Sequence, residues 1–255
     1  MTEKTITPRM FPPGRHIQAL LGLESSPVAV FFISSSSDWT RFEGFQSLSA
    51  HRYCQALMKA RHGESVCLKP EELHCPAAAA AFGFRPLPEK LACGQGLVEF
   101  GIVRTAERGR QMFESMSRLP PSQYQGLALS PLEDVRDVPD VVVLEASPEP
   151  LMWLLLAYFN LTGLRVVGDT AILQATCVDS TVIPFLSGRL NFSFGCYGCR
   201  DATDLAPSEA LVGFPGKILQ ELEEQLVFLA GKAMPHVRLK GAYHLLQGRD
   251  EGNIS

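Results

Sequence analysis

The chain has 255 residues, of which 46% are hydrophobic and 20% are charged, and its formal net charge is -4 at pH 7. A chain of this length and composition can bury a sizeable core, either as one large domain or as two tightly packed lobes. It contains no block of like charges and no basic stripe with interleaved aromatic residues, which argues against nucleic-acid binding.

The N-terminal region and the most apolar stretch bear on where the protein works. Residues 1–14 are proline-rich and contain no apolar run, so we predict a flexible segment rather than a secretory signal. The stretch "LMWLLLAYFNLTGL" (151–164) is shorter than the ~20 apolar residues that span a bilayer, and it predicts a buried helix. We therefore expect a cytoplasmic protein without a membrane segment, with one compact domain over 15–235 and a tail over 236–255.

The first half of the chain alternates between helix and strand patterns. A helix is predicted from Arg15, and the short apolar run "PVAVFFIS" (27–34) predicts a buried strand. The segment "SAHRYCQALMKARHG" (49–63) predicts a helix with Cys54 on its apolar face. Three further features follow: a short strand before Lys69-Pro70, an alanine-rich helix after Cys75-Pro76, and glycine-interrupted helical sequence over 88–116.

The second half of the chain continues this alternation. Strands are predicted over 124–132, 139–146, 190–195 and 210–215. Helices are predicted over 147–163, over 173–189 with an interruption near Pro184, and over 215–234. Strands interleaved with helices indicate an α/β fold in which a mixed sheet is packed with helices, with α+β as the alternative. Two lobes, 15–122 and 123–235, are compatible with this pattern.

The cysteines suggest an internal repeat. Cys54 precedes Cys75 at nearly the same spacing as Cys177 precedes Cys196, and the first cysteine of each pair lies in helix-like sequence. A glycine and a short strand-like segment follow in each pair, and the second cysteine ends that segment. We interpret the two pairs as related half-sites that face each other across one cavity, in two pseudo-repeated lobes. Chance similarity of the spacing is the alternative.

Several segments together resemble the prokaryotic domain of unknown function 169 family. The segments are "GLESSPVAVFF", "YCQALMKARHGE", "HCPAAAAAFGF", "VPDVVVLEASPEPLMWLLLAY", "CVDSTVIPFLSGRLNFSFGCYGCRD" and "ALVGFPGKILQEL", and they cover about residues 15 to 235. The resemblance implies a bacterial or archaeal soluble protein, and it attaches no reaction to the chain. It also implies recurring cysteines at Cys54, Cys75, Cys177 and Cys196, and a more variable position at Cys199.

These cysteines are candidate metal ligands, because four thiolates are the usual ligand set of an iron–sulfur cluster or a structural zinc. Zinc is the less favoured of the two, since only one Cys-x-x-Cys pair is present and the other cysteines are dispersed. Backbone N–H groups at Gly195 and Gly198 are candidates for bonding to the sulfurs, and Arg200 is a candidate for offsetting the negative charge. The predicted metal ligands are Cys54, Cys75, Cys177, Cys196 and Cys199.

Other interpretations of the cysteines stay open. Cys196 and Cys199 could form a redox dithiol, although the sequence after them is only weakly helical. Cys196 could instead be the nucleophile of a thiol-dependent enzyme, or the cysteines could simply pack as small hydrophobic side chains. A non-catalytic small-ligand binder with a pocket between two lobes is a further class.

Our leading hypothesis is a protein that binds an iron–sulfur cluster and has a redox or accessory role. The expected partner is a small molecule or a redox partner protein. The sequence leaves open whether the protein is an enzyme, and it leaves open its oligomeric state.

Overall fold

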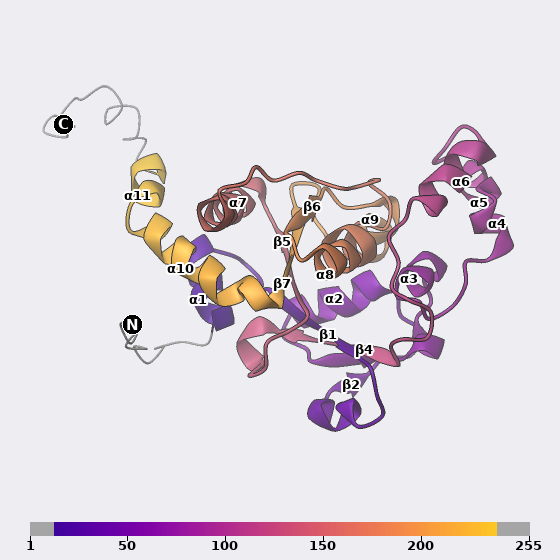
Figure 1. Ribbon diagram of the computed structural model, residues 1–255, viewed down its shortest axis with the longest axis horizontal. Helices are drawn as coiled ribbons and strands as arrows, with labels where there is room; N and C mark the ends of the chain where they lie inside the picture. Colours follow the sequence, from indigo (N-terminus) through magenta and orange to yellow (C-terminus); the bar gives the residue numbers. More distant parts are fainter. Residues whose placement is uncertain (1–12, 239–255) are drawn as a thin grey trace, which may run out of the picture.

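The computed structural model describes residues 13–238 and shows one seven-stranded sheet with helices on both faces (Figure 1). The strand order is β2-β3-β4-β1-β5-β7-β6. Only β2 and β3 pair in parallel, so the sheet is mixed and the predicted α/β class is confirmed. The strands are β1 (Val28–Ile33), β2 (Gln46–Ser47), β3 (Val66–Leu68), β4 (Gly126–Pro131), β5 (Val141–Ala146), β6 (Asn191–Ser193) and β7 (Ala210–Pro215).

Helices cover both faces because the central strands carry apolar side chains in both directions. In β1, Val28, Val30 and Phe32 face one core while the residues between them face the other. The first face is covered by α2 (Tyr53–Arg61), α3 (Pro76–Ala81), the π-helical segment η4 (Ala175–Val182) and α8 (Ile183–Ser187). The second face is covered by α1 (Pro13–Leu21), α7 (Pro148–Thr162) and α10 (Leu219–Ala230), after which α11 (Ala233–Arg238) follows.

Residues 1–12 and 239–255 lie outside the described part of the chain, and most of the predicted flexible segment and of the predicted tail falls there. Within 13–238, no helix combines the length and the apolar character that crossing a bilayer requires.

Six of the seven strands form two units with the same topology, and β2 extends the first unit at its outer edge. In the first unit β1 pairs with β4 and β4 with β3; in the second, β5 pairs with β7 and β7 with β6. The pairing register is also the same, because Val28 lies opposite Pro131 as Val141 lies opposite Pro215.

The innermost strands of the two units pair with each other about a local two-fold axis. Val28 lies opposite Val143 and Val30 opposite Val141, with Ala29 and Val142 paired at the centre. The strand pairing thus repeats within the sheet, and the two units meet between β4 and β5.

The two units differ most in the segment after their second strand. In the second unit, α9 (Tyr197–Ala202) is followed directly by a short loop and β7. In the first unit, the chain after α3 forms α4 (Glu89–Ala92), α5 (Gln95–Glu99) and α6 (Ala106–Glu114) before it reaches β4. The helical sequence predicted over 88–116 is thus three short helices, which pack closely because Gly94 and Gly109 bring their backbones into contact.

One testable consequence of this packing concerns Gly213 in β7. A Cβ atom at this position would lie 1.8 Å from the backbone oxygen of Ser180 in η4, so Gly213→Ala must displace backbone rather than a flexible side chain. We expect a loss of about 3 kcal/mol or more in the free energy of unfolding, measured by chemical denaturation. Gly231→Ala is the matched control, because the nearest atom to its added Cβ lies 3.7 Å away, and a change within about 0.5 kcal/mol is expected. Equal losses in the two variants would contradict the close approach.

Candidate functional site

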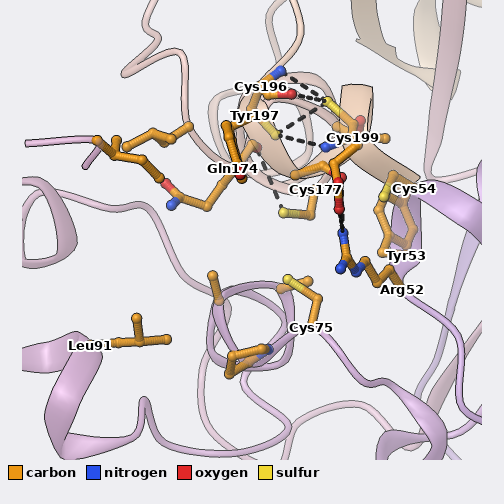
Figure 2. Close-up of a pocket in the computed structure, with 18 of the residues that line it drawn as sticks. Arg52, Tyr53, Cys54, Cys75, Leu91, Gln174, Cys177, Cys196, Tyr197 and Cys199 are labelled. Carbon is orange, nitrogen blue, oxygen red and sulfur yellow. Dashed lines mark hydrogen bonds and ion pairs between the residues drawn. The ribbon is translucent and has the colours of Figure 1, made fainter. Parts of the chain in front are cut away.

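A cavity of about 420 Å³ opens on the sheet face covered by α2, α3 and η4. Five of the chain's cysteines line it, and Figure 2 shows their sulfurs gathered around one space. These five residues are Cys54, Cys75, Cys177, Cys196 and Cys199. All of the predicted ligands therefore come together, while Cys67 is buried in the core on the opposite face and Cys93 is exposed.

The first unit contributes Cys54 and Cys75 from the beginnings of two helices. Cys54 lies in the first turn of α2, and Cys75 is the residue that precedes α3. Pro76 follows Cys75 at the first helical position, where its missing N–H and fixed φ angle suit the start of a helix. The backbone N–H groups of Ala77 and Ala78 donate to the Cys75 sulfur, which gives the thiol polar partners inside the cavity.

The second unit contributes Cys177 and Cys196 in corresponding places. Cys177 lies in the first turn of η4, and Cys196 is the residue that precedes α9. Backbone N–H groups of Ala175, Gly198 and Cys199 donate to the Cys196 sulfur. The four residues Cys54, Cys75, Cys177 and Cys196, which we call the four cavity cysteines, therefore form two pairs related by the internal repeat.

The four cavity cysteines are mutual neighbours. Every one of the six pairs that they form has an electrostatic interaction in which one thiolate raises the pKa of the other thiol. Burial is the largest cause of the raised pKa values of Cys54, Cys75 and Cys177, and for Cys54 the value reaches about 12. These three side chains are therefore neutral thiols at neutral pH, because the cavity disfavours several negative charges at once.

Cys196 differs from its neighbours through its contact with Cys199. The two sulfurs lie 3.2 Å apart, and the Cys196 N–H donates to the Cys199 sulfur at 2.9 Å. The hydrogen bond from the Cys199 thiol is the largest cause that lowers the pKa of Cys196, to about 6, and backbone N–H groups add to it. The same contact raises the pKa of Cys199, which is buried. The lowered pKa favours the thiolate form of Cys196 at neutral pH, with the Cys199 thiol as the hydrogen-bond donor that stabilises it.

The cation beside the cavity is Arg52, which the sequence analysis did not single out. Its guanidinium donates to the Asp201 carboxylate at 3.0 Å and to the Gly198 carbonyl at 3.2 Å, and so joins α2 to α9. Arg52 also lowers the pKa of Cys54 and Cys75, against the effect of burial. Arg52 lies two residues before the predicted ligand Cys54, and this closeness in the sequence is the signal by which it could have been found.

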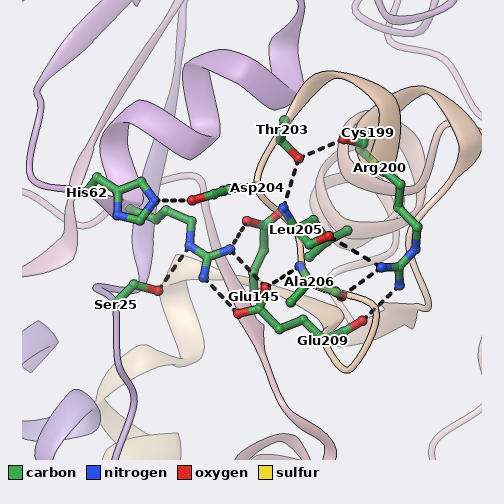
Figure 3. Close-up of polar contacts among 11 residues, drawn as sticks. Ser25, His62, Glu145, Cys199, Arg200, Thr203, Asp204, Leu205, Ala206 and Glu209 are labelled. Atoms are coloured by element: carbon green, nitrogen blue, oxygen red, sulfur yellow. Dashed lines mark hydrogen bonds and ion pairs between the residues drawn. The ribbon is translucent and has the colours of Figure 1, made fainter.

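The predicted Arg200 and Gly195 occupy other places, whereas Gly198 lines the cavity. The Arg200 guanidinium donates to backbone carbonyls, including that of Ala206 at 2.7 Å and that of Glu209 at 3.0 Å, and thereby holds the loop after α9 (Figure 3). Gly195 has a φ of +86° and packs against Leu205 and Arg200. Neither Arg200 nor Gly195 is among the residues that line the cavity.

A buried ion network behind the cavity ties the two units together (Figure 3). Arg61, at the end of α2, donates to Glu145 of β5 at 2.8 Å and to Glu209 at 2.7 Å. Glu209 lies in the loop that connects α9 to β7, so Arg61 links the helix of Cys54 to the segment that follows Cys196 and Cys199. The network fixes the relative positions of the two sides of the cavity.

Within residues 13–238, no group of three or more His, Cys, Asp or Glu side chains is arranged to hold a metal ion. A family model described as DUF169, Uncharacterised ArCR, matches residues 16–225. No curated protein and no solved structure shows significant similarity to the chain.

Proposed function

Since the chain belongs to the DUF169 family of uncharacterised proteins, we propose a function from the cavity itself: the protein binds an iron–sulfur cluster through the four cavity cysteines. The observation that carries the proposal is that these four thiols line one cavity (Figure 2), close enough for each to affect the pKa of the others. Four convergent cysteines are the usual ligand set of a [4Fe–4S] cluster.

The arrangement of the ligands supports a cluster more than a single zinc ion. A cubane cluster holds its thiolates roughly 6–7 Å apart, whereas sulfurs around one tetrahedral zinc lie about 3.8 Å apart, as the ~2.3 Å zinc–sulfur bond requires. The four cavity cysteines come from four separate segments, whereas a structural zinc site usually draws on two short Cys-x-x-Cys pairs.

The electrostatics of the cavity also support the proposal. Cys54, Cys75 and Cys177 are neutral thiols in the structure, and a bound cation is what deprotonates a coordinating thiol. N–H groups at Cys75 and Cys196 and the Arg52 guanidinium then stabilise the negative charge of the four thiolates. Hydrogen bonds to sulfur and burial are the protein's means of setting a cluster's potential, which suits a redox or accessory role.

The test of this proposal is anaerobic purification of the full-length protein. We expect brown protein that contains equal amounts of iron and acid-labile sulfide, with a broad absorption band that bleaches in air. Chemical reconstitution with iron and sulfide under reducing conditions is the second arm for protein that loses the cluster during purification. Colourless, iron-free protein after both procedures would overturn the proposal.

A dithiol function is the second candidate, and the 3.2 Å contact between the Cys196 and Cys199 sulfurs favours it. In this reaction the Cys196 thiolate attacks a substrate disulfide and releases one thiolate. Cys199 then loses its proton and attacks the mixed disulfide at Cys196, which releases the second thiol. The substrate disulfide is reduced to two thiols and the protein dithiol is oxidised to a disulfide.

The iron-free protein allows a direct test of the Cys196 thiolate. In a Cys93→Ser background, which removes the exposed cysteine, iodoacetamide should alkylate Cys196 before Cys54 at pH 7. The reason is that the pKa of Cys196 is lowered to about 6 while that of Cys54 is raised to about 12, and only the thiolate reacts. Peptide mass spectrometry over a pH series should give a rate that rises with a midpoint near 6. Preferential alkylation of Cys54 would contradict the assignment.

A further inference from the structure

The cavity is also lined by six apolar side chains, five of which come from α4–α6 and their connections, where the three helices pack on one another. We call this part the apolar end of the cavity; its residues are Leu91, Leu97, Phe100, Ile102, Phe113 and Leu173. In the view of Figure 2, Leu91 lies on the opposite side of Cys75 from Cys54. None of the six is a candidate metal ligand, and the proposed cluster does not account for them.

The apolar end is built almost entirely by the segment that only the first unit contains. All of its residues except Leu173 come from α4–α6 and their connections, whereas the second unit passes from α9 to β7 through a short loop. The second unit therefore forms its three paired strands without a segment that corresponds to α4–α6. What α4–α6 add on the cavity side is an apolar wall that faces Cys75.

Space of this kind is costly to leave unfilled. Protein interiors pack closely, and apolar cavities destabilise the folded state roughly in proportion to their volume. The whole cavity, including the space between the cysteines, measures about 420 Å³, and small-molecule sites are mostly apolar cavities of ~300–1,000 Å³ with few polar groups. Phe100 and Tyr197, with 66% and 61% of their surfaces exposed, stand where the cavity meets solvent and leave a route for a small molecule.

We propose that the apolar end of the cavity binds a small, uncharged, ring-sized apolar molecule beside Cys75. Apolar burial supplies the binding energy, and a charged group is rejected because the wall offers it no ion partner. This site goes beyond the proposed cluster and does not depend on it, because its lining and the ligands of the cluster are different residues. It places a bound molecule next to the sulfurs, where a redox group or a thiol could act on it.

The experiment uses toluene as the probe and benzoate as its charged counterpart. Full-length protein labelled in its leucine and isoleucine methyl groups is titrated with each under reducing conditions and followed by NMR. We expect toluene to shift the signals of Leu91, Leu97 and Ile102 and to leave those of Leu222 and Leu226, in the core beneath α10, unchanged. Benzoate should cause no comparable shift. No shift with toluene, uniform shifts across both cores, or equal binding of benzoate would each overturn the proposal.

Substitutions locate the site independently of iron content. Ala77→Phe directs a ring into the cavity and should weaken toluene binding at least about tenfold. Val138→Phe is the matched control, because exposed Val138 lines a groove that shares no residue with the cavity, and toluene binding should be unchanged. If Ala77→Phe fails to fold, Ile102→Trp fills the same end from a loop. Unchanged toluene binding in the folded filling variant would overturn the site, whereas loss of iron alone would bear only on the cluster.

Discussion

Cys196→Ser is expected to abolish cluster binding, while Cys199→Ser should retain most of the iron. Cys196 is one of the four cavity cysteines and interacts with each of the other three. Cys199 also lines the cavity, but it is buried, and of the four cavity cysteines it contacts Cys196, whose sulfur lies 3.2 Å from its own. Loss of Cys199 removes one hydrogen bond to a ligand sulfur, which should shift the cluster's reduction potential more than its occupancy.

Iron and sulfide content, thiol–disulfide activity and melting temperature of the two single variants distinguish the three interpretations of this pair. A dithiol predicts that both substitutions remove activity about equally, because exchange needs an attacking and a resolving thiol. Simple packing predicts only a stability loss of ~1–3 kcal/mol for each buried hydroxyl without a partner. Equal loss of iron in both variants would contradict our assignment and would make Cys196 and Cys199 joint ligands.

Arg61→Met should produce the largest loss of stability among the ion-pair variants. It leaves the Glu145 carboxylate buried without its cation, and breaking a buried pair in this way costs about 3–5 kcal/mol. Arg41→Met is the control, since Arg41 and Asp137 form an exposed pair whose removal should cost no more than about 1 kcal/mol. Urea denaturation of both variants measures the difference, and similar losses would contradict the importance of the buried network.

The pH dependence of this network has a definite sign. Burial is the main cause that raises the pKa of Glu145 from 4.5 to about 7, so between these values the folded protein holds a proton that the unfolded chain releases. The free energy of unfolding contributed by Glu145 therefore falls as pH rises from 4.5 to 7, by on the order of 3 kcal/mol. Glu145→Gln should flatten this part of the stability profile, and Arg61→Met should cost more at pH 8 than at pH 5. A wild-type profile that rises over this window and is unchanged by Glu145→Gln would contradict the shift.

The sequence alone determined the main strands and helices and the membership of the cysteine group. Continuous apolar runs predicted β1 and β5, because strands covered on both faces carry apolar side chains in both directions. The similar spacings of the two cysteine pairs indicated the repeat, because each cysteine holds the same position relative to the strands in both units. Local pattern was sufficient there, since hydrophobic periodicity and short-range spacing are properties of the chain itself.

Other features depended on contacts between distant segments. The helix α9 is only six residues long and includes a glycine, so its pattern was too short to recognise; its first turn is held instead by the Cys196–Cys199 contact and by Arg52 from α2. Arg200 was the nearest cation to Cys196 in the sequence, yet Arg52 lies at the cavity because the sheet brings α2 against α9. The apolar end likewise joins α4–α6 to Leu173 only in the folded chain. A side chain's neighbours across a cavity follow from the pairing of the strands, and that pairing is a property of the whole sheet that no local stretch of sequence carries.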